Sequence, residues 1–185
     1  MLFVLCAAIL LLSASGTVPS IDIQQSLEVA LHLVRDGTVE VDSVVLAGGG
    51  AVLGDDGRPY AAHNLGMPGL FLPLAMGAGP TTEVSGLYGV ASLVVPVVSA
   101  AGVVAFWALQ RRAGSGERVA LVAALVYAFA TLVWPYAHDG FDVGPTNAAV
   151  VVALMALLAA ADAGGGVGEG APAPQQGVGE GAPAP

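Results

Sequence analysis

The stretch Gly86–Leu109, GLYGVASLVVPVVSAAGVVAFWAL, decides the fold class because its 24 residues contain no charged side chain. A helix of about 20 apolar residues crosses the hydrocarbon core of a bilayer, and a charge at its centre costs about 2.5–3.5 kcal/mol. Two further stretches, 119–136 and 143–161, have the same character. We therefore predict that all three are membrane-spanning helices.

The chain opens with a fourth apolar stretch, residues 2–15, whose uncharged core of about 14 residues is short for a span. Two interpretations stay open. It is either a retained first membrane helix, which we favour, or a signal peptide cleaved near its small C-terminal residues, although the positive charges that precede such a peptide are missing. The prediction is an all-α membrane protein, with about four transmembrane helices in a polytopic domain at 1–163.

The composition of the whole chain agrees with the membrane class. Hydrophobic residues make up 56% of the chain and charged residues 10%, whereas about a quarter of a soluble domain is charged. A net charge of -9 with five basic residues argues against nucleic-acid binding, which needs clustered Lys and Arg to neutralise phosphates. We predict a multi-pass protein of the cell membrane with the lipid bilayer as its first partner.

The arginines set the predicted orientation. Arg111, Arg112 and Arg118 lie between the second and third predicted spans, and short cytoplasmic loops collect positive charge. The loop at 16–83 and the turn at 137–147 are then predicted to lie on the outer face. These two segments hold ten of the 14 carboxylates: Asp22, Glu28, Asp36, Glu40, Asp42, Asp55, Asp56, Glu83, Asp139 and Asp142.

The outer loop begins with the pattern of an amphipathic helix. Apolar residues recur at helical spacing from Ile23 to Val34, the opposite face is polar, and Gly37 ends the pattern. We assign Gln24, Glu28, His32 and Arg35 to that polar face. Asp22 stands just before this helix, at the capping-box spacing from Gln25.

The rest of the outer loop predicts three further local structures. Thr38–Val44 alternates like a β-strand, and Asp55-Asp56-Gly57 is a turn signal that closes a hairpin against the next residues. Met67–Gly79 is apolar but short and interrupted by prolines and glycines, which suits an interfacial or re-entrant segment. The last segment, 164–185, contains GVGEGAPAP twice and is predicted to be a disordered low-complexity tail.

Short patches in a fixed order run through these segments. They are Ser20-Ile21-Asp22, Val34-Arg35-Asp36-Gly37, Gly57-Arg58-Pro59-Tyr60, Leu65–Pro73 and, in the third predicted span, Leu125–Ala137. Because it has these patches in this order, the chain resembles the N-terminal part of bacterial C-type membrane glycosyltransferases. These are the polyprenyl-phosphate-sugar-dependent enzymes of the family 39 type. The layout of Met1 to Ala161 follows the resemblance, while the specific patches total about forty residues.

The resemblance implies transfer of a hexosyl or pentosyl group from a polyprenyl-phosphate carrier to an acceptor on the outer face. Asp22 matches the carboxylate that serves as the base, because the acceptor hydroxyl must lose a proton as it attacks. The second outer loop offers Asp139 and Asp142 as further acidic candidates, with a separation that permits a shared face. Arg58 is the candidate for the carrier phosphate, since guanidinium binds phosphate oxygens in pairs.

Each candidate also has a simpler interpretation. Asp22 is equally well explained as a helix cap, and Asp139 and Asp142 as part of a polar turn. Arg58 can pair with the nearby Asp55 and Asp56 instead of a phosphate, which we favour. The cofactor is left open. A divalent metal at Asp139 and Asp142, with His138 beside them, is conceivable, but no further ligand is apparent nearby, so no residue is assigned to metal binding.

The chain departs from the resembled family in its size. Such transferases use many more spanning helices, so the sequence suggests a truncated or split member. The alternative function is that of a non-catalytic integral membrane protein that anchors or associates with a partner through its helices, because small residues in the spans permit close helix approach.

Overall fold

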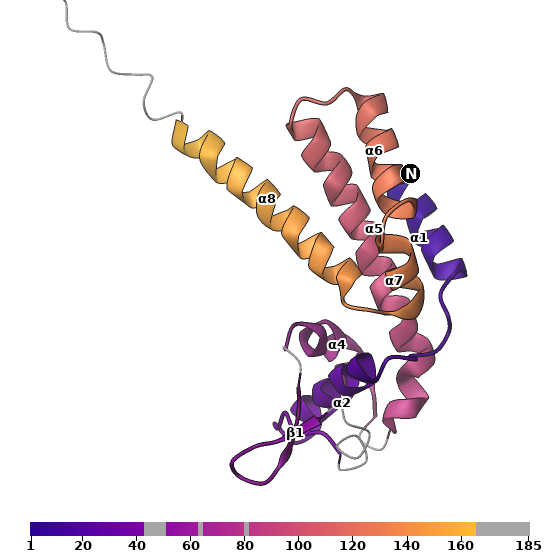
Figure 1. Ribbon diagram of the computed structural model, residues 1–185, viewed down its shortest axis with the longest axis vertical. Coiled ribbons are helices and arrows are strands. Elements are labelled where there is room, and N and C mark those ends of the chain that lie inside the picture. Colours follow the sequence, from indigo (N-terminus) through magenta and orange to yellow (C-terminus); the bar gives the residue numbers. More distant parts are fainter. Residues whose placement is uncertain (43–50, 63–64, 80–81, 166–185) are drawn as a thin grey trace, which may run out of the picture.

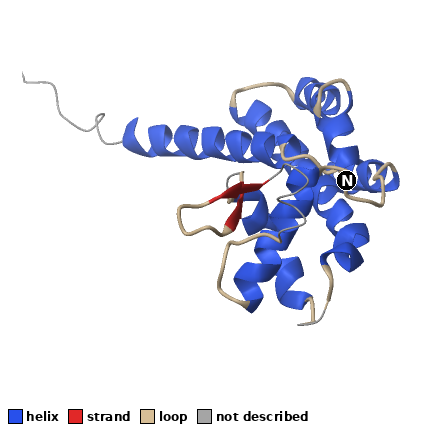
Figure 2. Ribbon diagram, turned by 60° about the horizontal axis from the view of Figure 1, so that its bottom comes forward, coloured by secondary structure: helices blue, strands red, loops and turns tan. Residues whose placement is uncertain are grey.

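The computed structural model describes residues 1–42, 51–62, 65–79 and 82–165 of the chain. The described part is mostly helical and has one small antiparallel sheet (Figures 1 and 2). Its elements are α1 (Leu2–Leu12), α2 (Ile21–Arg35), β1 (Ala51–Leu53), β2 (Pro59–Ala61), α4 (Gly66–Gly77), the 3₁₀ helix η1 (Val84–Leu87), α5 (Tyr88–Arg112), α6 (Glu117–Phe129), α7 (Val133–Asp139) and α8 (Val143–Gly165). The segment 166–185, which carries nearly all of the predicted disordered tail, lies outside the described residues.

Two helices are long and apolar enough to cross a membrane, Val84–Arg112 and Val143–Ala163, and a third span is formed if α6 and α7 count as one. These helices bear out the prediction of a helical membrane protein. The predicted number of four spans is not confirmed. α1 has 11 residues, which at 1.5 Å per residue is about 16 Å and falls short of the roughly 30 Å hydrocarbon core.

The predicted third span, 119–136, is broken into α6 and α7, which are bent by 44°. Pro135 lies in the first turn of α7, where proline is tolerated, but its ring would clash with the carbonyl of residue 131 in one continuous helix. Thr131 stabilises the break, because its Oγ1 donates to the Tyr127 carbonyl at 2.6 Å and accepts from the Val133 amide at 3.2 Å. The sequence pattern missed this break because every residue around it is uncharged.

α5 contributes to two hydrophobic cores, one along its N-terminal part and one that begins at its middle. In Figure 1, α2 and α4 lie near the N-terminal part of α5, and α1 and α6 lie along its other half. Its N-terminal part contributes Leu87 of the preceding turn, Ala91 and Val95 to a core shared with α2 and α4. Its C-terminal part contributes Ala100 and Val103 to a second core, shared with α1, α6 and α7. We call the first part of the molecule, residues 16–87, the outer layer, and the second part the helix bundle.

α8 begins in close contact with the middle of α5 and then diverges from the other helices (Figures 1 and 2). A Cβ added at Gly102 would lie 2.8 Å from the Cβ of Ala148, and one at Gly144 would lie 2.2 Å from the Oγ of Ser99. Glycine at both positions therefore permits the helix axes to approach closely. Beyond this contact the apolar side chains of α8 are exposed, with Leu157 at 67%.

In the outer layer, α2 packs against α4 through large side chains. Leu27 and Leu31 of α2 and Phe71 of α4 are fully buried. This confirms the predicted apolar face of α2, and Gly37, at φ +69°, follows its end as predicted. The prediction for the other face is wrong at Glu28, which is 3% exposed. Met67–Gly79, predicted as interfacial or re-entrant, forms mostly the helix α4 in this core.

The predicted hairpin is present. β1 and β2 pair antiparallel with Ala51 opposite Ala61 and Leu53 opposite Pro59, and the turn between them contains Gly57 at φ +75°. The described part of the predicted strand Thr38–Val44 contributes one isolated bridge, between Glu40 and Tyr60. Residues 43 and 44 of that prediction lie outside the described residues.

Candidate functional site

Asp22 lies within the first turn of α2 and is half-buried. The predicted capping box is wrong, because the helix begins at Ile21 and its N-cap position is Ser20. The backbone carbonyl of Asp22 accepts a hydrogen bond from the Ser26 hydroxyl at 2.8 Å, as expected inside a helix. A negative side chain in the first turn interacts favourably with the helix dipole, so Asp22 suits this place on structural grounds alone.

Arg58 lies on the hairpin and is held by carboxylates of the outer layer. Its Nη1 donates to Oε1 of Glu40 at 2.5 Å, and its Nε is 3.9 Å from Oδ2 of Asp56. The favoured internal pairing with a neighbouring acid is therefore observed, although Glu40 and not Asp55 or Asp56 is the closest partner. The guanidinium remains more than half exposed.

Asp139 and Asp142 lie at the junction of α7 and α8. Gly140, at φ +78°, ends α7 between them, so their spacing of three does not place them on one helical face. His138 Nε2 is 3.7 Å from Oδ1 of Asp139, and the His138 Nδ1 faces the Ser13 carbonyl. This junction is thus tied to the segment that follows α1 and does not form a group of three metal-ligating side chains in the described structure.

A different group of three side chains does come together in the outer layer. We call Glu28, His32 and Asp42 the outer-layer cluster. One candidate ligand atom from each residue lies within 4.8 Å of the others. Glu28 and His32 are four residues apart in α2 and so share a helical face, and Asp42 lies beyond the turn that follows α2.

The backbone of the segment after α2 holds the cluster in place. The Asp42 amide donates to Oε1 of Glu28 at 3.1 Å, and the Glu40 carbonyl accepts from Nδ1 of His32 at 2.8 Å. Since a carbonyl can only accept, Nδ1 carries the proton and Nε2 is the nitrogen with a free lone pair. The other oxygen of Glu28, Oε2, is buried with no hydrogen-bond partner among the described residues.

Burial raises the pKa of Glu28 from its ordinary value of 4.5 to about 7. The Asp42 amide, which donates to Glu28, acts in the opposite direction, and so does His32. The Asp42 carboxyl group adds to the increase, first through a side-chain hydrogen bond and then through its negative charge. A carboxyl group with its pKa near neutrality exchanges protons readily at physiological pH, which is a property of general bases and of unoccupied cation sites.

Sequence reasoning missed this cluster because it assigned Glu28 and His32 to a solvent face and Asp42 to a strand. The available signal was the spacing of a Glu and a His four residues apart, followed by an acid beyond the Gly37 turn. Spacing alone does not show that the segment after α2 folds back over this face of the helix.

An apolar groove of about 460 Å³ lies where α4, α5 and α8 meet. Its lining includes Gly66, Leu70, Val98, Ala101, Ala148 and Val152. The groove therefore lies between the outer layer and the first turns of α8, and its lining is apolar.

Comparisons of this chain with protein-family models, with curated proteins and with solved structures found no match. The resemblance to C-type membrane glycosyltransferases therefore stays a prediction.

Proposed function

We propose that the chain is a multi-pass protein of the cell membrane that acts as a membrane glycosyltransferase or as the N-terminal part of one. It transfers a sugar from a polyprenyl-phosphate carrier to an acceptor on the outer face, with Asp22 as the base. The observation that supports this function is the shared hydrophobic core of the acidic outer layer and the N-terminal part of α5, a helix of membrane-spanning length, with Asp22 in the first turn of the outer-layer helix α2.

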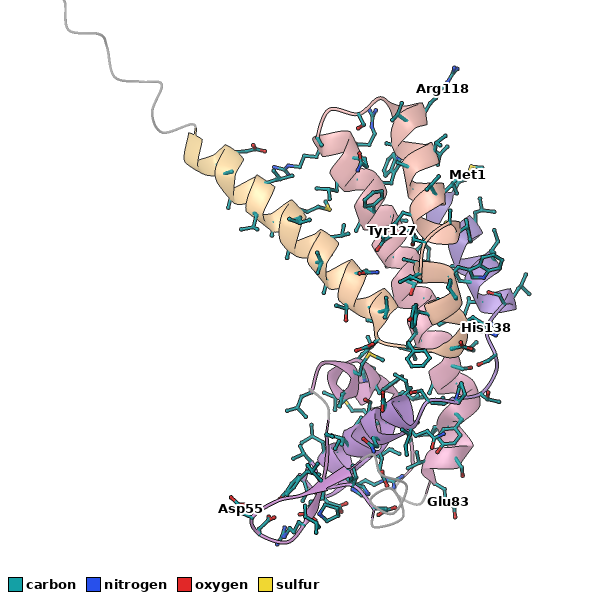
Figure 3. All side chains as sticks on the ribbon, in the orientation of Figure 1. Met1, Asp55, Glu83, Arg118, Tyr127 and His138 are labelled. Atoms are coloured by element: carbon teal, nitrogen blue, oxygen red, sulfur yellow. The ribbon has the colours of Figure 1, made fainter. Side chains whose placement is uncertain are left out.

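The distribution of charge along the molecule supports the orientation that this function requires. Arg118 lies at one end, while Asp55 and Glu83 lie at the opposite end with the outer layer (Figure 3). Because positive residues favour the cytoplasmic side, the outer layer is then extracytoplasmic. Lipid-linked sugars present their anomeric carbon at the membrane surface. In this proposal, a base on α2 takes the proton of the acceptor hydroxyl there as the hydroxyl attacks that carbon.

The apolar groove between α4, α5 and α8 supports a lipid-linked donor. Its lining residues carry no charge, and it opens beside the outer layer. An isoprenoid chain is a branched hydrocarbon that such a surface can accommodate. Arg58 is paired with Glu40, so in this proposal it reaches a carrier phosphate only by exchanging one anionic partner for another.

The experiment uses the full chain in liposomes with a radiolabelled polyprenyl-phosphate hexose or pentose. Asp22→Asn is expected to abolish transfer while membrane insertion stays as in the wild type and the free energy of unfolding falls by no more than about 1 kcal/mol, since Asn keeps the size of the side chain and loses only the charge at the helix N-terminus. Asp36→Asn is the matched control, because Asp36 is exposed at the other end of the same helix. A transferase activity that survives Asp22→Asn would refute the role of this base.

A second candidate function, association with a partner through the helices, is favoured by α8. The apolar window of this helix is 17% buried, so most of its surface is left to lipid or to another helix. Energy transfer between labelled copies in liposomes tests self-association. A signal that persists on dilution with lipid, and that falls when Leu154 and Leu157 are replaced by Ala, would support the second function over the first.

A further inference from the structure

The outer-layer cluster combines two carboxylates and an imidazole, the ligand set of many divalent-cation sites. The three candidate ligand atoms lie within 4.8 Å of one another. Ligands of Zn²⁺ lie about 2.0–2.2 Å from the ion, so a small rotation of the exposed Asp42 side chain closes the cluster around a cation. Glu28 and His32 are four residues apart on α2 and therefore lie on the same face of that helix.

His32 is oriented as a metal ligand is. Histidines that bind a metal through one ring nitrogen usually donate the other N–H to a carbonyl or a carboxylate. In this structure Nδ1 donates to the Glu40 carbonyl at 2.8 Å, which leaves Nε2 with its lone pair. The hydrogen bond fixes both the tautomer and the plane of the ring.

Glu28 supplies an independent observation. The residue is 3% exposed, and Oε2 is buried with no hydrogen-bond partner among the described residues. A buried oxygen of this kind carries a large desolvation cost unless a cation or a proton binds it. A second carboxylate, that of Asp42, lies beside it, so two acidic groups face one imidazole and a cation in the cluster would offset their negative charge.

We propose that the outer-layer cluster binds one divalent transition-metal cation of the Zn²⁺ or Mn²⁺ class through Glu28, His32 and Asp42, with water at the remaining positions. An imidazole ligand favours these ions over Mg²⁺ and Ca²⁺, which prefer all-oxygen sites. The site binds Zn²⁺ more tightly than Mn²⁺, in the usual order of affinities. This inference goes beyond the proposed transferase function and does not rest on it.

The bound cation would fasten the segment after α2 to the helix. Asp42 and Glu40 belong to that segment, and both contact residues of α2. A cation bridging Asp42 to Glu28 therefore adds a link across the turn at Gly37. Because the cation binds the folded chain, it raises the unfolding temperature in proportion to the logarithm of its concentration.

The test is calorimetric titration of ZnCl₂ into the full chain in detergent, purified without a polyhistidine tag and stripped of metal with a chelator. We expect one Zn²⁺ per chain, a higher unfolding temperature, weaker binding of Mn²⁺ and little response to Mg²⁺. Asp42→Asn and Glu28→Gln are each expected to lower the affinity for Zn²⁺ by at least about tenfold. Asp42 is exposed, so its variant keeps the fold even if Glu28→Gln perturbs it.

Asp139→Asn is the matched control, because Asp139 lies beside His138 in the other place where a histidine and acids are close. It is expected to bind Zn²⁺ as the wild type does. The proposal is overturned if the wild type shows no saturable binding, if Asp42→Asn binds with unchanged affinity, or if Asp139→Asn is the variant that loses binding.

Discussion

The outer layer and the helix bundle are built around cores of different character. The core of the outer layer contains large side chains, among them Phe71, Leu27 and Leu31, together with Ile23 and Met67. The core of the bundle is dominated by alanines, contributed by α1, α5, α6 and α7. Burial of large apolar surface stabilises a structure in water, whereas helices in lipid gain mainly from close packing of small residues. The two cores therefore match two solvents.

The buried polar groups of the two regions differ in charge. The outer layer buries a carboxyl group, Glu28, and an amide, Gln25, while α5 buries the hydroxyls of Ser92 and Ser99. Ser92 donates to the Gly89 carbonyl at 2.8 Å, whereas the Ser99 hydroxyl and the Gln25 amide have no hydrogen-bond partner among the described residues. A buried carboxyl group additionally needs a proton or a cation, because its charge is costly to bury, and a hydroxyl does not.

The largest effect is expected from Phe71→Ala in the core of the outer layer. Loss of a fully buried aromatic ring should lower the free energy of unfolding by about 3–5 kcal/mol. Chemical denaturation in detergent, followed by tyrosine and tryptophan fluorescence, measures this loss. Met76→Ala is the control, because Met76 lies in the same helix and is 73% exposed. Equal losses in the two variants would show that the outer layer has no hydrophobic core of this kind.

The second effect is a pH dependence of the free energy of unfolding of the outer layer, measured in metal-free protein. Glu28, facing Asp42 and His32, has a pKa raised from 4.5 to about 7 in the folded state, so its protonated form stabilises the fold. This contribution is fully present below about pH 4.5 and is lost as the pH rises through about 7, a change of at most about 3 kcal/mol. Unfolding experiments across this range measure it.

Glu28→Gln serves as the matched variant for the pH experiment, because the amide does not titrate and keeps the shape of the side chain. It should flatten the fall in stability between pH 4.5 and 7, and a slope identical to that of the wild type would contradict the assignment to Glu28. Residues of the bundle core should show no comparable dependence, which sharpens the contrast between the two cores.

The smallest of the three effects is expected from Gly102→Ala at the contact of α5 with α8. The added methyl group meets the Cβ of Ala148 at 2.8 Å, so the helices must separate, at a cost of about 1–2 kcal/mol. Spin labels on α5 and α8 should report the increased distance. Gly69→Ala in α4 is the control, because an added Cβ there has no atom within 4 Å, and the variant should keep or gain stability. Unchanged label distances in Gly102→Ala would refute the tight contact.

The elements that depend on length and composition were predictable from the sequence. α5 and α8 follow from long uncharged stretches, and the hairpin from the Asp55-Asp56-Gly57 turn. The division of α6 from α7 was missed because an apolar run shows no change in composition at Pro135. Pro96 lies in a similar run and α5 continues through it, so neither hydropathy nor the presence of a proline marks where a helix is broken.

The candidate site was less predictable than the fold. The periodicity of α2 correctly placed Leu27 and Leu31 in a core, but it treated the opposite face as solvent. That face is covered by the segment at 38–42, and Glu28 is buried beneath it. The alternation of this segment predicted a strand, but it did not show that the segment packs onto α2. A helix covered on two sides by different kinds of structure has two buried faces, and a single amphipathic pattern shows one of them.

The length of α5 bears on how far the outer layer stands from a bilayer. With 25 residues, α5 is about 37 Å long, roughly 7 Å more than a typical hydrocarbon core. The excess is a little more than one helical turn. The outer layer packs against the N-terminal part of α5. Bilayer thickness therefore sets the height of α2 above the headgroups: a thicker membrane draws it down toward the lipid, and a thinner one lifts it into water.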